Sequence, residues 1–201
     1  MTDIKRRQML QMLGAVPAVA AFTWTREEAV AAAEQAGEAR RQAAASNQPY
    51  TPRFFTAHEM ATITALADLI LPKDDRSVSA SETGTTEFID YLISEQTDRQ
   101  TAIRGGLAWL DAECLGRFNK AFVDCSDAER RAVADDIAWP KRARPEMSQG
   151  VRFFNTMRDL VATGFWSSRE GVADLGYMGN RMTVWNGAPE NVLQKLGVSY
   201  D

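Results

Sequence analysis

The sequence offers a single histidine, His58, as a starting point for chemistry. His58 lies in the first turn of an expected helix, one position before Glu59. Metal centres and nucleophilic sites need several suitable side chains at defined spacings, and no second histidine or cysteine lies at ligand spacing from His58. We therefore interpret His58 as a solvated or structural side chain.

Two pairs of adjacent carboxylates, Asp74-Asp75 and Asp135-Asp136, are the next candidates for acid and base catalysis. Neighbouring acids on a loop or an exposed helix face are usually hydrated, and nothing around these pairs indicates a desolvating pocket. They do not predict an active site. A hydrolase or isomerase that uses Asp68, Asp74 or His58 remains an alternative, and it requires activity in the isolated chain.

The two cysteines, Cys114 and Cys125, are eleven positions apart. In the cytosol they would be buried apolar side chains. After export they could form a disulfide, because residues 115–124 can fold back as a helix–loop hairpin. The bridge requires the two Cα atoms to lie within about 7 Å of each other.

Motifs for cofactors and nucleic acid are absent from the sequence. It has no C-x-x-C-H for haem, too few cysteines for an iron–sulfur cluster and no G-x-G-x-x-G after a strand. The net charge is −4, and no basic cluster is interleaved with aromatic residues as nucleic-acid binding would require. The sequence therefore predicts a chain with no catalytic, cofactor-binding or metal-binding residues of its own.

The elements that position these residues are expected to be helices. Apolar residues recur at three- and four-residue spacings, and no alternating strand pattern is present. The spacings Thr56 to Glu59 and Ser126 to Glu129 are typical of capping boxes. Helices are expected over residues 56–71, from 86 onward, over 98–119, from 126 onward and over 147–163. The predicted fold is all-α, a compact multi-helix domain with an irregular, aromatic and glycine-rich C-terminal segment.

Two glycine positions carry further expectations. Gly105-Gly106 lowers helix propensity inside the helix over residues 98–119, which indicates close packing against a neighbour. Gly164 is expected to end the helix over 147–163 as its C′ residue.

The chain divides into three segments by composition. Residues 1–24 contain a basic region with Arg6-Arg7, an apolar run and an A-x-A sequence, which together are typical of a twin-arginine export signal. An amphipathic N-terminal helix that is never exported is the alternative. Residues 25–52 are rich in Ala, Glu, Gln and Arg, and we expect a solvated linker or a loosely held helix there. The folded domain is expected over residues 53–201.

Residues 164–189 combine five glycines with four aromatic side chains and fit neither a helical nor a strand period. The segment predicts either a packed loop that caps the domain or a surface that docks a partner. The candidate docking residues are Phe165, Trp166, Gly176, Tyr177, Gly179, Asn180 and Trp185.

Several stretches, taken together and in order, resemble the gluconate 2-dehydrogenase subunit 3 family, the small subunits of membrane-associated FAD-dependent sugar and polyol dehydrogenases. They are residues 55–59, 67–72, 87–92, 106–111, 174–180 and 185–189, and they cover roughly residues 53–190. The loop over residues 73–83 departs from the Pro/Gly-rich acidic turn that is common in the family.

The resemblance implies an all-α accessory subunit that binds no cofactor. It implies a partner similar to glucose–methanol–choline (GMC) oxidoreductases that holds FAD, with an iron–sulfur cluster as an optional second group, and that often passes electrons to a cytochrome c subunit. The small subunit would carry the twin-arginine signal for both chains, so the flavoprotein would reach the periplasm as a hitch-hiker, and the complex could associate with the membrane. No membrane span beyond the signal is expected. A stand-alone periplasmic binding or scaffold protein without a flavoprotein partner is the alternative.

Overall fold

The structure, a computed structural model, describes residues 25–46, 50–177 and 187–199. These residues form eight α-helices and no strand, which confirms the predicted all-α fold. The helices are α2 (Arg26–Ser46), α3 (Ala57–Ile70), α4 (Thr85–Glu95), α5 (Thr97–Phe118), α6 (Asp127–Ala138), α7 (Ser148–Ser167), α8 (Arg169–Leu175) and α9 (Glu190–Leu196). Short 3₁₀ turns, η1 (Ser81–Thr83), η2 (Phe122–Asp124) and η3 (Pro145–Met147), lie between them.

Helices α3 and α6 begin at the two predicted capping boxes. Thr56 Oγ1 accepts the backbone N–H of Glu59, and the Glu59 carboxylate accepts the backbone N–H of Thr56. Ser126 and Glu129 make the same reciprocal pair at the start of α6. Both boxes satisfy backbone donors that the first turn of a helix leaves free.

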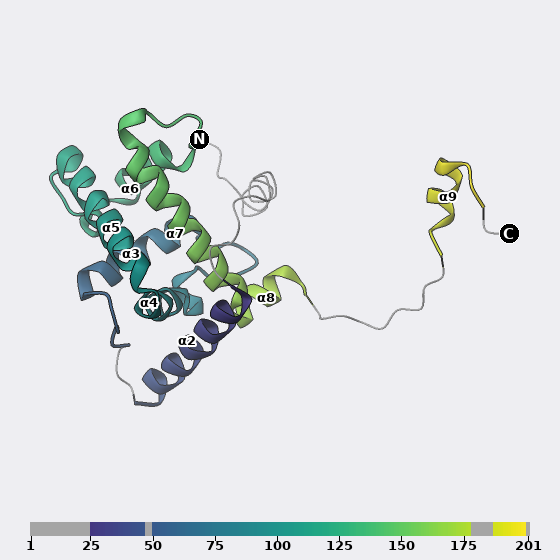
Figure 1. The fold of residues 1–201 in the computed structure, drawn as a ribbon, viewed down its shortest axis with the longest axis horizontal. Helices are drawn as coiled ribbons and strands as arrows, with labels where there is room; N and C mark the ends of the chain where they lie inside the picture. Colours follow the sequence, from purple (N-terminus) through teal and green to yellow (C-terminus); the bar gives the residue numbers. More distant parts are fainter. Residues whose placement is uncertain (1–24, 47–49, 178–186, 200–201) are drawn as a thin grey trace.

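Helix α7 is the central element of the bundle, since it contacts α2, α3, α4, α5, α6 and α8. Figure 1 shows it running through the body of the molecule, with these helices gathered around it. Its core face includes Met157 and Leu160, both without exposed surface. The predicted close approach at Gly106 is confirmed, because a Cβ there would lie 1.9 Å from the ring of Phe153 on α7.

The predicted end of this helix at Gly164 is wrong. Helix α7 continues to Ser167, and Gly164 is buried inside it. A Cβ at Gly164 would lie 2.9 Å from the ring of Phe88 and 3.0 Å from Thr85. The glycine therefore allows α4 to approach α7 closely instead of ending the helix.

Residues 26–46 form a helix, the second of the two alternatives expected for this segment, and this helix packs on the bundle. Helix α2 contacts α4 and α7, with Ala32 fully buried and Ala36 5% exposed. Alanine side chains bring the helix close to its neighbours without a large apolar stripe. The packed part of the molecule therefore begins at Arg26, well before residue 53.

Helix α9 differs from the other helices. None of its residues is buried, and in Figure 1 it lies apart from the rest of the bundle. Among the described residues, no helix has both the length and the apolar character required to cross a bilayer.

Candidate functional site

The most buried carboxylate of the described residues, Asp90 on α4, has a structural role. Its oxygens accept the backbone N–H groups of Arg53, Phe54 and Phe55 at 2.7 to 3.1 Å. The hydroxyl of Tyr50 donates to the same carboxylate at 2.7 Å, and burial followed by this hydrogen bond raises the pKa of Tyr50. Asp90 therefore fixes the chain that leads into α3.

The other candidate acids also accept hydrogen bonds from loops. Asp68 accepts the backbone N–H and the hydroxyl of Ser81 at 2.9 and 2.8 Å. Asp74 accepts the backbone N–H groups of Arg76 and Ser77, each at 2.9 Å. Both carboxylates therefore act as structural acceptors that fix loops in place.

His58 lies 2.6 Å from Asp111, measured from its Nε2 to the carboxylate oxygen. The hydrogen bond to Asp111 raises the pKa of His58, and the second oxygen of Asp111 accepts the backbone N–H of Phe122. The His58 side chain is half exposed. The pair joins α3 to α5 and η2 at the surface, and the described residues contain no cluster of three potential metal ligands around it or elsewhere.

Cys114 and Cys125 are neighbours in the fold, as the hairpin interpretation requires. Both thiols are free and buried, Cys114 at the end of α5 and Cys125 just before α6. Burial and the neighbouring Cys125 raise the pKa of the Cys114 thiol to about 12. A raised pKa lowers the reactivity of the Cys114 thiol as a nucleophile at neutral pH. The disulfide stays a prediction.

The candidate docking residues divide by exposure. Phe165 is 0% exposed and packs edge-on to Trp166 with ring centroids 5.6 Å apart. Phe165 is therefore not a docking residue as predicted, because its side chain is part of the hydrophobic core and has no exposed surface for a partner. Tyr177 is 62% exposed beside Gly176, whose φ of 66° ends α8 in the left-handed conformation.

One side of α7 carries polar groups that the sequence did not single out. Asn155 Oδ1 and Trp166 Nε1 are buried atoms without a hydrogen-bond partner among the described residues, and Arg158 Nε, which also lacks a hydrogen bond, forms an ion pair with Asp159. Spacings of three and eight residues place them on one side of the helix, turned away from Met157. Burial also raises the pKa of the Asp159 carboxyl on this side, which Arg158 approaches at 3.7 Å. We call Asn155, Arg158, Asp159 and Trp166 the α7 polar stripe.

The stripe has hydrogen-bonding capacity that the described part of this chain does not use. A buried donor or acceptor without a partner is unfavourable by about 1–3 kcal/mol, and the side chains that carry these atoms are themselves only partly buried. Only Trp166 of this stripe was a predicted docking residue. The others were missed because a sequence period does not reveal whether a polar side chain has found a partner.

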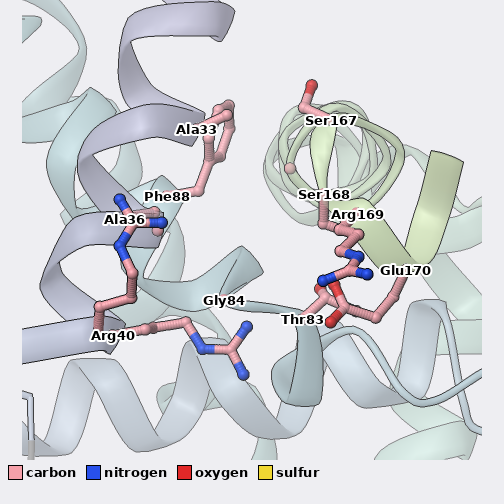
Figure 2. A pocket seen from close by; sticks show the side chains of 13 residues that line it. Ala33, Ala36, Arg40, Thr83, Gly84, Phe88, Ser167, Ser168, Arg169 and Glu170 are labelled. Atoms are coloured by element: carbon pink, nitrogen blue, oxygen red, sulfur yellow. The ribbon is translucent and has the colours of Figure 1, made fainter. Parts of the chain in front are cut away.

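A groove of about 640 Å³ lies between α2 and the junction of α7 with α8. Figure 2 shows Arg40 extending from α2 toward Gly84, with Arg169 and Glu170 on the opposite wall. Arg40 donates to the carbonyl of Glu82 at 2.7 Å. Gly84 has a φ of 85°, and a Cβ there would lie 2.6 Å from the Arg40 side chain. The groove has charged walls but holds no paired acid and base.

Five of the predicted residues lie outside the described part of the chain. They are the export-signal residues Arg6 and Arg7 and the docking candidates Gly179, Asn180 and Trp185.

Comparison with protein families gives one match. The sequence profile described as gluconate 2-dehydrogenase subunit 3 matches residues 57–187, from the start of α3 to just before α9. This family consists of non-catalytic subunits of periplasmic dehydrogenase complexes. Neither the curated proteins nor the solved structures that were compared with the chain gave a match.

Proposed function

Because the chain belongs to the gluconate 2-dehydrogenase subunit 3 family, we propose that it is the small subunit of a periplasmic FAD-dependent sugar or polyol dehydrogenase. In this role it binds and stabilises the catalytic flavoprotein and supplies its export signal. The observation that carries the proposal is the family match over residues 57–187. The roles of Asp68, Asp74 and Asp90 as acceptors for loop donors support a subunit that acts by binding.

FAD belongs to the partner in this proposal, together with any iron–sulfur cluster. The partner is a GMC-type flavoprotein, which often transfers electrons to a cytochrome c subunit. The small subunit contributes contacts and no redox group of its own.

The α7 polar stripe and Tyr177 are the described surface that suits this partner best. Trp166 combines a large ring with a free buried donor, and aromatic side chains of this kind dominate binding energy at protein interfaces. Tyr177 offers a second ring at the point where the chain leaves α8. Gly179, Asn180 and Trp185 remain docking candidates from the sequence, and they lie outside the described residues.

Residues 1–24 serve as the address for export of the complex. The twin-arginine route carries folded cargo, and a flavoprotein with bound FAD is folded before transport. Arg6 and Arg7 are the residues that the export receptor would recognise.

Purification of the chain from its native host through a C-terminal affinity tag tests the proposal. We expect a yellow complex in which a flavoprotein is present in a 1:1 ratio and reduces an artificial electron acceptor when a sugar is supplied. A colourless chain alone would contradict the proposal. It would favour the stand-alone binding protein, for which the groove between α2 and α7 is the candidate ligand site.

A further inference from the structure

Exposed apolar side chains gather at the C-terminal end of the described chain. Of seven large apolar residues with exposed side chains in the described residues, five lie between 175 and 198. They are Leu175, Tyr177, Val192, Leu196 and Val198. Scattered exposed apolar residues are ordinary, but a concentration of this kind marks an interaction surface.

Helix α9 presents three of its apolar side chains as one face. Val192 and Leu193 lie four and three residues before Leu196, and these spacings place each of them beside Leu196 on the same side of the helix. Val192 is 39% exposed and Leu196 is 69% exposed. The bundle described over residues 25–177 does not bury this face.

Local capping explains why α9 forms without tertiary packing. Gly197 has a φ of 67°, and its N–H donates to the carbonyl of Gln194, while the N–H of Val198 donates to the carbonyl of Leu193. This pair of hydrogen bonds is a Schellman motif. Glu190 in the first turn and Lys195 in the last complement the helix dipole. An isolated helix of seven residues is nevertheless marginal in water, so a surface that covers its apolar face would stabilise α9.

The size of this face indicates what kind of partner covers it. Three apolar side chains cover on the order of a few hundred Å², whereas a stable interface buries about 800 Å² on each partner. Two copies of α9 therefore cannot hold a dimer by themselves. The face is suited to extend a larger interface that is formed elsewhere on the chain.

The chain has the length to reach such a second site. Twelve residues, 178–189, separate Tyr177 from Glu190. A segment of that length can span up to about 40 Å when extended. Helix α9 can thus bind a part of a partner that is remote from the α7 polar stripe.

We propose that α9 is a docking helix that inserts Val192, Leu193 and Leu196 into an apolar groove on the catalytic flavoprotein, separate from the contacts of the bundle. Amphipathic helices commonly bind grooves in this manner. The inference rests on the proposed function, since the flavoprotein is its occupant.

The test uses the flavoprotein that co-purifies with the full-length chain. Its Kd is measured for the full-length chain, for a chain ending at Gly187, and for the double variant Val192→Ser with Leu196→Ser. Leu115→Ser is the matched control, because Leu115 is 57% exposed on α5 and lies outside the proposed face. Circular dichroism and thermal unfolding of each isolated chain accompany the binding measurements.

We expect both tail variants to raise the Kd at least tenfold, with the control bound as tightly as the original chain and all four proteins unfolding at the same temperature. Unchanged binding by the tail variants would overturn the docking helix and leave the proposed function intact. A lower unfolding temperature of the tail variants would overturn it as well, because α9 would then pack on its own bundle. Loss of self-association in the tail variants would also overturn the docking helix, because it would identify a second copy of this chain as the occupant of the apolar face. A full-length chain that binds no flavoprotein would reject both proposals.

Discussion

Acidic side chains of this chain are acceptors that fix loops onto helices. Asp90, Asp68 and Asp111 accept donors from segments that lie 11 to 40 positions away in the sequence. The two capping boxes could be predicted because donor and acceptor are three residues apart. The role of Asp90 could not, because its donors reach it only through the tertiary fold.

Asp90→Asn is expected to destabilise the domain by about 2–4 kcal/mol. The amide replaces one acceptor oxygen by a donor, which then faces the backbone N–H groups of residues 53–55 or the hydroxyl of Tyr50. The free energy of unfolding in urea measures the effect. Asp135→Asn, an equivalent change at an exposed position of α6, is the control. Equal stability of the two variants would contradict the structural role of Asp90.

The cysteine pair is expected to form a disulfide when the chain is exported. Cys114 and Cys125 are buried neighbours, and closing the short loop between them would stabilise the fold by about 2–3 kcal/mol. Intact mass of periplasmic material, denatured in the presence of an alkylating reagent with and without reductant, measures the number of thiols. Two alkylated thiols before reduction would count against the bridge.

At the scale of elements, the sequence located α3, α5, α6 and most of α7 because each has an apolar stripe or a capping signal. It did not predict the last turn of α7, the packing of α2 or helix α8, which lies inside the segment expected to be irregular. Gly164 was interpreted as a helix end, although its small size serves close packing with Phe88. The sequence also could not show that Phe165 is buried and Tyr177 exposed. That difference depends on the register of the helices, which the glycine and aromatic content of residues 164–189 does not reveal.

The packing of α2 predicts unequal effects of the same substitution at adjacent positions. Ala32→Glu places a charge in a fully buried position and is expected to destabilise the protein by about 2–4 kcal/mol. Ala31→Glu introduces the same charge at an exposed position and is expected to leave stability unchanged. Thermal unfolding compares the two. An equal response would restore the interpretation of residues 25–52 as a solvated linker.

At the scale of the whole molecule, the proposed function assigns binding to the surface of the helical bundle and to the two ends of the chain. The N-terminal segment supplies the proposed address. The α7 polar stripe, Tyr177 and α9 supply the proposed contacts with the flavoprotein. Some of the motifs that carry the family resemblance have internal roles. Residues 87–92, for example, include Asp90, whose carboxylate fixes the chain before α3.

Replacement of Arg6 and Arg7 by lysine is expected to keep both chains in the cytoplasm. Lysine retains the positive charge but not the planar guanidinium, whereas a general secretion signal requires only a basic region and an apolar stretch. Periplasmic dehydrogenase activity should fall while total cell activity persists, as measured by fractionation of both chains. Normal export of both chains would remove the proposed route, and normal export of the flavoprotein alone would show that the two travel separately.

Native mass spectrometry of the chain purified from periplasm tests the central claim, a stable complex with a flavoprotein, most directly. The account predicts one species whose mass is the sum of this chain, one flavoprotein subunit and one FAD. Collisional dissociation should release the small chain without flavin and leave the FAD on the larger one. A species at or below the 22.3 kDa of this chain, or a multiple of it without flavin, would contradict the account.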